Sequence, residues 1–173
     1  MEIAAYDFGL LVLRVGVGIP FALHGFQKLL GWFGGGGIKG TSAWFSSLGF
    51  GNGKVATLVA GTGEIVGGVG LALGLLTPVS AAAVAGTMTT AAFVNNAASG
   101  FWSVSKGWEL NGYLIVVATA LAITGPGSLS LDAALDLPDL IGVPLNGVTG
   151  ALLVGAAVFG GWLRWTTRTK EQT

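Results

Sequence analysis

The chain contains no cysteine and only one histidine among its 173 residues. The lack of cysteine excludes disulfides, thiolate catalysis and thiolate metal sites within this chain. A single histidine excludes bis-histidine haem ligation within one chain, and scattered carboxylates around it predict no metal site. No glycine-rich phosphate loop follows a strand, so no nucleotide site is indicated. The sequence therefore shows no evident cofactor motif and no identifiable catalytic residue.

Charge is also scarce in this chain. Charged residues make up 9% and hydrophobic residues 52%, whereas a soluble domain carries about 25% charged residues. The net charge is zero, which argues against nucleic acid as a partner. The composition predicts a polytopic integral membrane protein whose main partner is membrane lipid.

Five apolar segments approach the roughly 20 residues that a membrane-spanning helix needs. They cover residues 8–30, 55–76, 79–98, 110–124 and 143–165. The predicted fold is an all-α transmembrane bundle, with four core helices in residues 1–133. Residues 134–173 would supply a connecting loop, a fifth helix and a basic tail. Glu2 and Asp7 stand where a signal peptide carries positive charge, so we expect the first segment to be retained.

The basic residues predict the orientation. With five spans and a cytoplasmic C-terminus, one side of the membrane receives Lys39, Lys54, Lys106, Arg164, Arg168 and Lys170. The opposite side receives an acidic loop that contains Asp132, Asp136 and Asp139. This distribution obeys the positive-inside rule. We expect a bacterial inner (plasma) membrane protein with its C-terminus in the cytoplasm.

Ionisable side chains inside the predicted spans are candidate functional groups, because charge at the bilayer centre is costly. Arg14, His24 and Lys28 fall within an arc of roughly 80° on the first span, at about 100° per residue. Glu64 in the second span is the candidate counter-charge for Arg14 or Lys28. These four residues form a predicted intramembrane polar cluster.

Two interpretations of this cluster remain open. It is either a structural ion pair that fixes helix register, or a site where His24 and Glu64 handle protons or a ligand such as quinone. Glu109, at the start of the fourth span, and Asp132 are secondary polar positions. The third span adds hydrogen-bonding groups, which are Thr87, Thr89, Thr90, Asn95 and Asn96.

Glycines at small-residue spacing mark one stripe of the second span. They are Gly63, Gly67, Gly70 and Gly74. Such a stripe lets another helix approach closely. The approaching helix belongs either to this chain or to a second copy, and we expect a homo-oligomer.

Several ordered motifs resemble the DoxX family of small bacterial membrane proteins. They are Leu13-Arg14 and Phe21 to Leu29 (FALHGFQKL) in the first span, Gly63 to Gly68 (GEIVGG) and Gly74 to Thr77 (GLLT) in the second, and Gly125-Pro126-Gly127 with Ser130-Leu131-Asp132 after the fourth. The resemblance covers residues 8–133. The fifth segment lies beyond the family's usual four-helix unit.

The resemblance implies a four-helix membrane core linked to respiratory or oxidative-stress systems. The family is named after a quinone-reducing, thiosulfate-oxidising system, and some relatives look like membrane anchors for redox enzymes. By position, the family's polar residues correspond to Arg14, His24, Lys28, Glu64, Glu109 and Asp132. We therefore expect a membrane subunit or scaffold with a redox-enzyme partner, at most a quinone-linked oxidoreductase subunit and not a stand-alone enzyme. The alternative is a small-solute or proton transporter that works as an oligomer.

Overall fold

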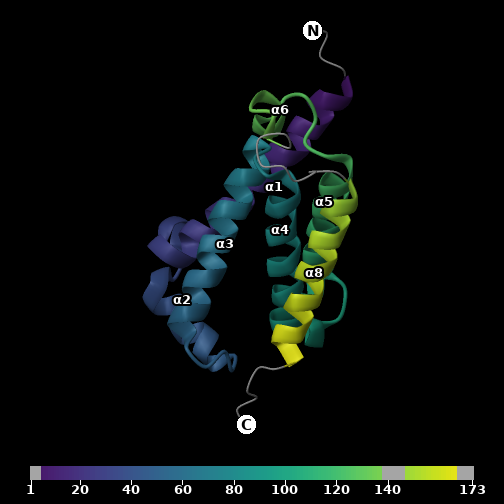
Figure 1. The fold of residues 1–173 in the computed structure, drawn as a ribbon. Helices are drawn as coiled ribbons and strands as arrows, with labels where there is room; N and C mark the ends of the chain where they lie inside the picture. Colours follow the sequence, from purple (N-terminus) through teal and green to yellow (C-terminus); the bar gives the residue numbers. More distant parts are fainter. Residues whose placement is uncertain (1–4, 138–146, 167–173) are drawn as a thin grey trace.

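The computed structural model describes residues 5–137 and 147–166, and every regular element in these ranges is helical (Figure 1). The main helices are α1 (Ala5–Leu30), α2 (Gly37–Ser47), α3 (Gly53–Leu73), α4 (Thr77–Ala91), α5 (Glu109–Thr124), α6 (Leu131–Ala134) and α8 (Gly147–Thr166). Short helical turns connect them, including a π-helical extension of α4 over Ala92–Asn96. The predicted all-α membrane bundle is confirmed.

Four helices are long and apolar enough to cross a membrane, and they match the first, second, third and fifth predicted segments. They cover Ala5–Leu30, Gly53–Leu73, Thr77–Val94 and Gly147–Arg164. The fourth segment forms α5, which has 16 residues and is therefore about 24 Å long, shorter than a hydrocarbon core of about 30 Å. The predicted start of the fifth segment at Val143 lies outside the described residues, as do Glu2, Asp139, Arg168 and Lys170.

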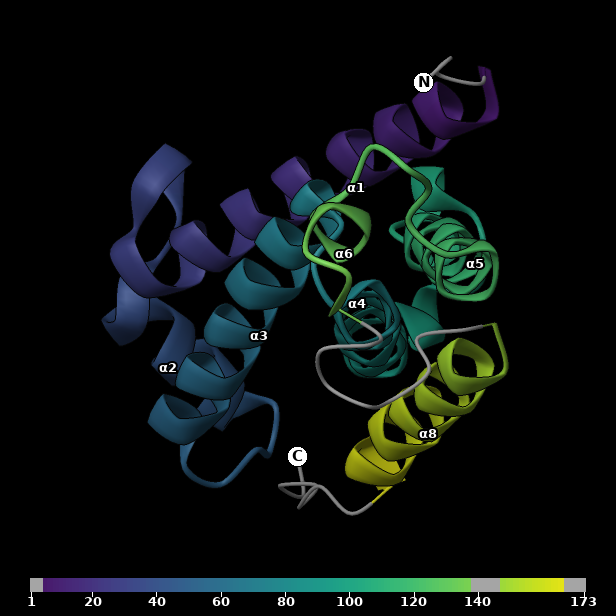
Figure 2. The same cartoon turned by 45° about the horizontal axis from the view of Figure 1, so that its top comes forward.

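The helices form two groups. One group contains α1, α2 and α3, and the other contains α4, α5 and α8 (Figure 2). Extensive contacts occur within each group and between α3 and α4. The fifth helix of the prediction, α8, packs along both α4 and α5 and contributes Val154 to the buried core. Helix α8 is thus an integral part of the bundle.

Glycines allow α1 and α3 to lie in close contact. A β-carbon on Gly25 of α1 would lie only 2.6 Å from the Gly61 carbonyl oxygen of α3. Farther along α3, Gly67 and Gly70 face Ala83 and Ser80 of α4. Part of the predicted glycine stripe is therefore used within this chain, since small residues bring membrane helices together. The predicted homo-oligomer remains a prediction.

A tight turn joins α3 to α4, and we call its residues 74–77 the apex. Gly74 ends α3 in the left-handed conformation, with φ of 64°, which glycine adopts at low cost. Leu76 also has a positive φ, of 45°, and Pro78 occupies the first turn of α4, where a missing N–H does no harm. From the apex, α3 and α4 diverge toward the opposite end of the bundle (Figure 1).

The end of the bundle remote from the apex carries basic side chains. Lys39 lies on α2, Lys54 in the first turn of α3, Lys106 just before α5, and Arg164 near the end of α8. These segments lie together at the lower end in Figure 1, whereas α6 and the start of α1 lie at the apex end. Asp7 and Asp132 lie at the apex end instead, close to Ser128 and Thr77 respectively. The side of the membrane that each end faces stays a prediction.

Candidate functional site

Lys28 and Glu64 form a buried ion pair between α1 and α3. The Lys28 ammonium nitrogen lies 2.7 Å from both carboxylate oxygens of Glu64. The Glu64 side chain is only 3% exposed, and that of Lys28 is 23% exposed. Of the two candidate partners for Glu64, the fold selects Lys28. A buried carboxylate needs such a partner, because an unpaired charge away from water is costly.

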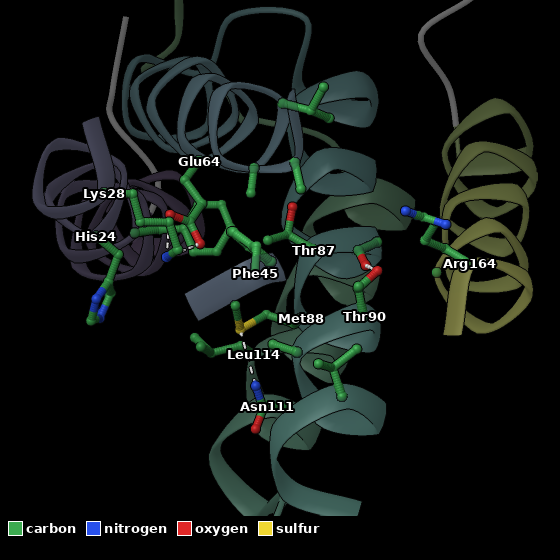
Figure 3. A pocket seen from close by; sticks show the side chains of 18 of the residues that line it. His24, Lys28, Phe45, Glu64, Thr87, Met88, Thr90, Asn111, Leu114 and Arg164 are labelled. Atoms are coloured by element: carbon green, nitrogen blue, oxygen red, sulfur yellow. Dashed lines mark hydrogen bonds and ion pairs between the residues drawn. The ribbon is translucent and has the colours of Figure 1, made fainter. Parts of the chain in front are cut away.

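This ion pair lies on the wall of a large pocket between the two helix groups (Figure 3). The pocket has a volume of about 860 Å³, within the range of roughly 300–1,000 Å³ that is typical of sites for small ligands. Its lining is mainly apolar, with residues from α1, α2, the loop after α2, α3, α4, α5 and α8. Thr87, Asn111 and Arg164 add polar groups. The Asn111 amide nitrogen lies 3.6 Å from the Met88 sulfur.

His24 lines the same pocket but does not join the ion pair. Its Nδ1 lies 2.9 Å from the Gln27 side-chain oxygen, and the residue is exposed. In Figure 3 the imidazole points away from Glu64. His24 therefore stands at the pocket rim, one helical turn from Lys28.

Arg14 lies apart from the pocket, beside the apex. Its side chain is fully buried, and its guanidinium donates to the Leu129 carbonyl oxygen and rests against Gly74. Asp132 lies close enough for a Coulomb attraction to Arg14. Among the described protein groups, the Arg14 Nε and Nη1 atoms have no hydrogen-bond partner. The predicted four-residue cluster is thus divided, with Lys28 and Glu64 paired and Arg14 placed elsewhere.

Asp132 is the centre of this second polar site. Its carboxylate accepts the backbone N–H groups of Leu76 at 2.6 Å and of Thr77 at 2.9 Å. Its own backbone N–H donates to the Gly74 carbonyl oxygen at 2.8 Å. Asp132 therefore caps the N-terminus of α4, where a helix offers unsatisfied N–H donors and favours negative charge.

Glu109 belongs to neither site. It occupies the first position of α5 and accepts the backbone N–H of Ser103 at 2.9 Å. This contact ties the short turn before α5 to the helix. The geometry gives Glu109 a local structural contact, and Glu109 itself does not line the pocket.

Sequence comparison identifies the family of this chain. The DoxX family model matches residues 9–97, just over half of the chain. The chain belongs to the DoxX family. It is a DoxX membrane protein whose matched segment contains α2, α3, α4 and nearly all of α1, and hence both members of the Lys28–Glu64 pair.

Two curated proteins are similar to this DoxX chain. "Putative oxidoreductase CatD" of Bacillus subtilis (strain 168) is 30% identical over 128 residues, which cover 74% of this chain and 87% of the relative. "Inner membrane protein YphA" of Escherichia coli (strain K12) is 29% identical over 142 residues, which cover 73% of this chain and 94% of the relative. No solved structure matches the chain at a significant level.

Some residues of the pocket could not be predicted from the sequence. The sequence marks Arg164 only as an orientation signal and predicts no functional role for Asn111 and Phe50, yet all three line the pocket. Asn111 is detectable as an amide inside an apolar segment, whereas nothing in the sequence places Phe50 beside Arg164. Within residues 5–137 and 147–166, no three histidine, aspartate or glutamate side chains gather as metal ligands. The side chains of Asn95 and Asn96 lie outside the described part of the chain.

Proposed function

We propose that this DoxX protein is an integral membrane subunit of a redox or oxidative-stress system, and that its pocket binds a quinone-type molecule from the bilayer. The observation that carries the proposal is the buried Lys28–Glu64 pair on the wall of an 860 Å³ pocket with mainly apolar lining. Such a pocket suits an amphiphile with an apolar body and a small polar head.

The charge balance of the pair favours a neutral head group. Lys28 and Glu64 neutralise each other at 2.7 Å, so an anionic or cationic ligand would have to compete with an existing partner. An ammonium group has three N–H donors, and the two Glu64 oxygens accept two of them. The third can donate to a carbonyl oxygen of a ligand, which a quinone possesses. Lys28 would thus orient the head group while Glu64 holds the ammonium in place.

One relative and the family resemblance support a redox setting. The Bacillus relative carries the name "Putative oxidoreductase CatD", and the family resemblance connects such chains with respiratory and oxidative-stress systems. A bound quinone would carry electrons and protons between redox partners. The residues of this chain would bind and orient it and exclude water, and a partner enzyme would supply the redox centre.

The same proposal includes a location. The name of the Escherichia relative places that protein in the inner membrane. In this chain, the basic residues gather at the end of the bundle remote from the apex, which supports a cytoplasmic position for that end and for the C-terminus. Protease protection of a C-terminal tag in inverted and right-side-out vesicles tests this orientation.

Direct binding tests the quinone proposal. The protein is reconstituted in lipid nanodiscs and titrated with a short-tailed ubiquinone, with calorimetry as the readout. We expect Lys28→Met to weaken binding at least tenfold, because it removes a donor and leaves Glu64 unpaired. Lys39→Met, which changes an exposed lysine of α2, should bind as the wild type does.

A second variant separates a loss of binding from a loss of the folded structure. Thr87→Phe fills the pocket and leaves the ion pair intact, so it should abolish binding without disturbing Lys28 or Glu64. If the wild type binds no quinone, or if Thr87→Phe binds it normally, the pocket is not a quinone site. Mass spectrometry of proteins that co-purify in mild detergent identifies the redox partner, and a preparation that contains only this chain would count against the subunit role.

The alternative function is transport of a small solute or of protons by an oligomer. The observation that favours it is a pocket between two helix groups, in which α3 and α4 are in close contact near the apex and diverge away from it. Proteoliposomes loaded with a pH-sensitive dye distinguish the two functions. Flux that Thr87→Phe blocks would support transport, and flux equal to that of empty liposomes at all pH values would remove it.

A further inference from the structure

Arg164 of α8 connects the two helix groups at the end remote from the apex. Its Nη2 donates a long hydrogen bond, of 3.4 Å, to the Phe50 carbonyl oxygen. Its guanidinium carbon lies 4.8 Å from the centre of the Phe50 ring, within cation–π distance. Phe50 belongs to the loop between α2 and α3. Arg164 and Phe50 both line the pocket.

Phe50 belongs to an aromatic cluster in the group formed by α1, α2 and α3. It is buried, and its ring packs edge-on against Phe45 with 5.2 Å between centroids. Phe45 in turn contacts Trp44 at 4.9 Å, and both residues line the pocket. Arg164 therefore connects α8 to a packed aromatic cluster in the group formed by α1, α2 and α3.

The position of this contact gives it mechanical importance. The contacts of Gly67 and Gly70 with Ala83 and Ser80 hold α3 against α4 near the apex. The pocket occupies the space farther from the apex, and Arg164 crosses that space to reach Phe50. A cation–π contact and a long hydrogen bond are individually weak and reversible. If this contact broke, the groups would separate at this end while the contacts near the apex stayed in place.

The pocket also reaches the outer surface of the bundle between α3 and α8. Val59 of α3 lines the pocket although 69% of its surface is exposed. Gly160 of α8 is likewise both exposed and part of the lining. In a membrane this outer surface faces lipid. A ligand dissolved in the bilayer would therefore meet the pocket from the side.

We propose that the Arg164–Phe50 contact is a releasable latch, and that its opening lets a bilayer-dissolved amphiphile pass between α3 and α8 into the pocket. The identity of the ligand rests on the proposed function, whereas the opening itself does not. Arg164 acts here as a positioning residue that controls access, and Lys28 and Glu64 meet the head group inside.

Distances between spin labels test the opening without any ligand. The chain contains no cysteine, so Leu58→Cys on α3 and Phe159→Cys on α8 introduce two unique, exposed label positions outside the pocket lining. In nanodiscs, we expect Arg164→Gln to broaden the distance distribution and shift it to longer values. Phe50→Leu, which removes the ring from the other side, should give the same change. Lys39→Gln removes an exposed positive charge elsewhere and should leave the distribution unchanged.

Ligand exchange kinetics test the consequence for access. Stopped-flow measurement with a short-tailed ubiquinone should show association and dissociation both at least threefold faster in Arg164→Gln, with intermediate rates in Arg164→Lys. Unchanged distances in both Arg164→Gln and Phe50→Leu would overturn the latch. Changed distances with unchanged exchange rates would overturn its role in access. A wild type that binds no quinone would refute the proposed function, and the distance measurement would still decide the latch.

Discussion

Asp132 and Thr77 lie 55 positions apart in the chain, yet the Asp132 carboxylate accepts the Thr77 backbone N–H at 2.9 Å. The neighbouring N–H of Leu76 donates to the same carboxylate at 2.6 Å. A helix of only four residues, α6, thus caps a membrane-spanning helix. Arg14 joins the arrangement from α1 through the Leu129 carbonyl. Two other segments, α1 and residues 129–132, therefore hold the apex in place.

The first prediction concerns this cap. Asp132→Asn replaces one acceptor oxygen by a donor that faces a backbone N–H, so it should lower the free energy of unfolding by about 1–3 kcal/mol. Thermal unfolding in detergent, followed by circular dichroism, measures the change. Asp136→Asn makes the same substitution at an exposed neighbour and should have little effect. Equal stability of the two variants would show that the cap contributes nothing.

The second prediction concerns the coupling of Arg14 to Asp132. Arg14→Gln and Asp132→Asn should each destabilise the protein, and the double variant should lose less than the sum of the two losses. We expect a coupling energy of roughly 0.5–3 kcal/mol, as for residues in one polar network. Unfolding of all four proteins under the same conditions gives this number. Strict additivity would mean that the two charges act independently.

The third prediction concerns the ion pair of the pocket. Glu64→Gln leaves a partly buried ammonium without its counter-charge, and Lys28→Gln leaves a buried carboxylate alone. Each single change should cost about 3 kcal/mol of unfolding free energy, with the larger loss for Lys28→Gln because Glu64 is the more buried partner. The double variant Lys28→Gln/Glu64→Gln should recover part of the loss. A double variant less stable than both single variants would contradict this explanation.

The fourth prediction concerns two glycines of α1. Gly25→Ala would place a β-carbon 2.6 Å from the Gly61 carbonyl oxygen, so α1 and α3 must separate, at a cost of about 1–3 kcal/mol. Gly9→Ala is the matched control, because no described atom lies within 4 Å of the added carbon. It should be neutral or stabilising by up to about 1 kcal/mol, since alanine favours helix over glycine. Thermal unfolding distinguishes the pair.

The helices themselves could be predicted well from the sequence. Long apolar runs have few structural solutions in a membrane, because every backbone polar group must be satisfied within the chain. The α1 segment, predicted over residues 8–30, is observed over Ala5–Leu30. The predicted end of α3 at Leu76 is too late, since the helix ends at Leu73, because an apolar run continues through a turn that Gly74 starts.

The side-chain partners could be predicted only where helix periodicity is sufficient. Lys28 and Glu64 are candidates for each other because both lie inside adjacent spans. The partner of Arg14 depends on how residues 127–132 fold back over the apex, and helix periodicity carries no information about that. The contact of Arg164 with Phe50 likewise joins residues 114 positions apart. Such contacts follow from the tertiary arrangement alone.

The distance along the chain between the apex and its cap has a consequence for biosynthesis. A ribosome that inserts this protein releases α1, α3 and α4 well before Asp132 emerges, so the turn at the apex must form without its cap. Helix α8, which carries Arg164 and lines one side of the pocket, is synthesised after these helices. The Lys28–Glu64 pair can therefore be in place while the pocket still lacks one side. The order of synthesis thus builds the charged site first and encloses it afterwards.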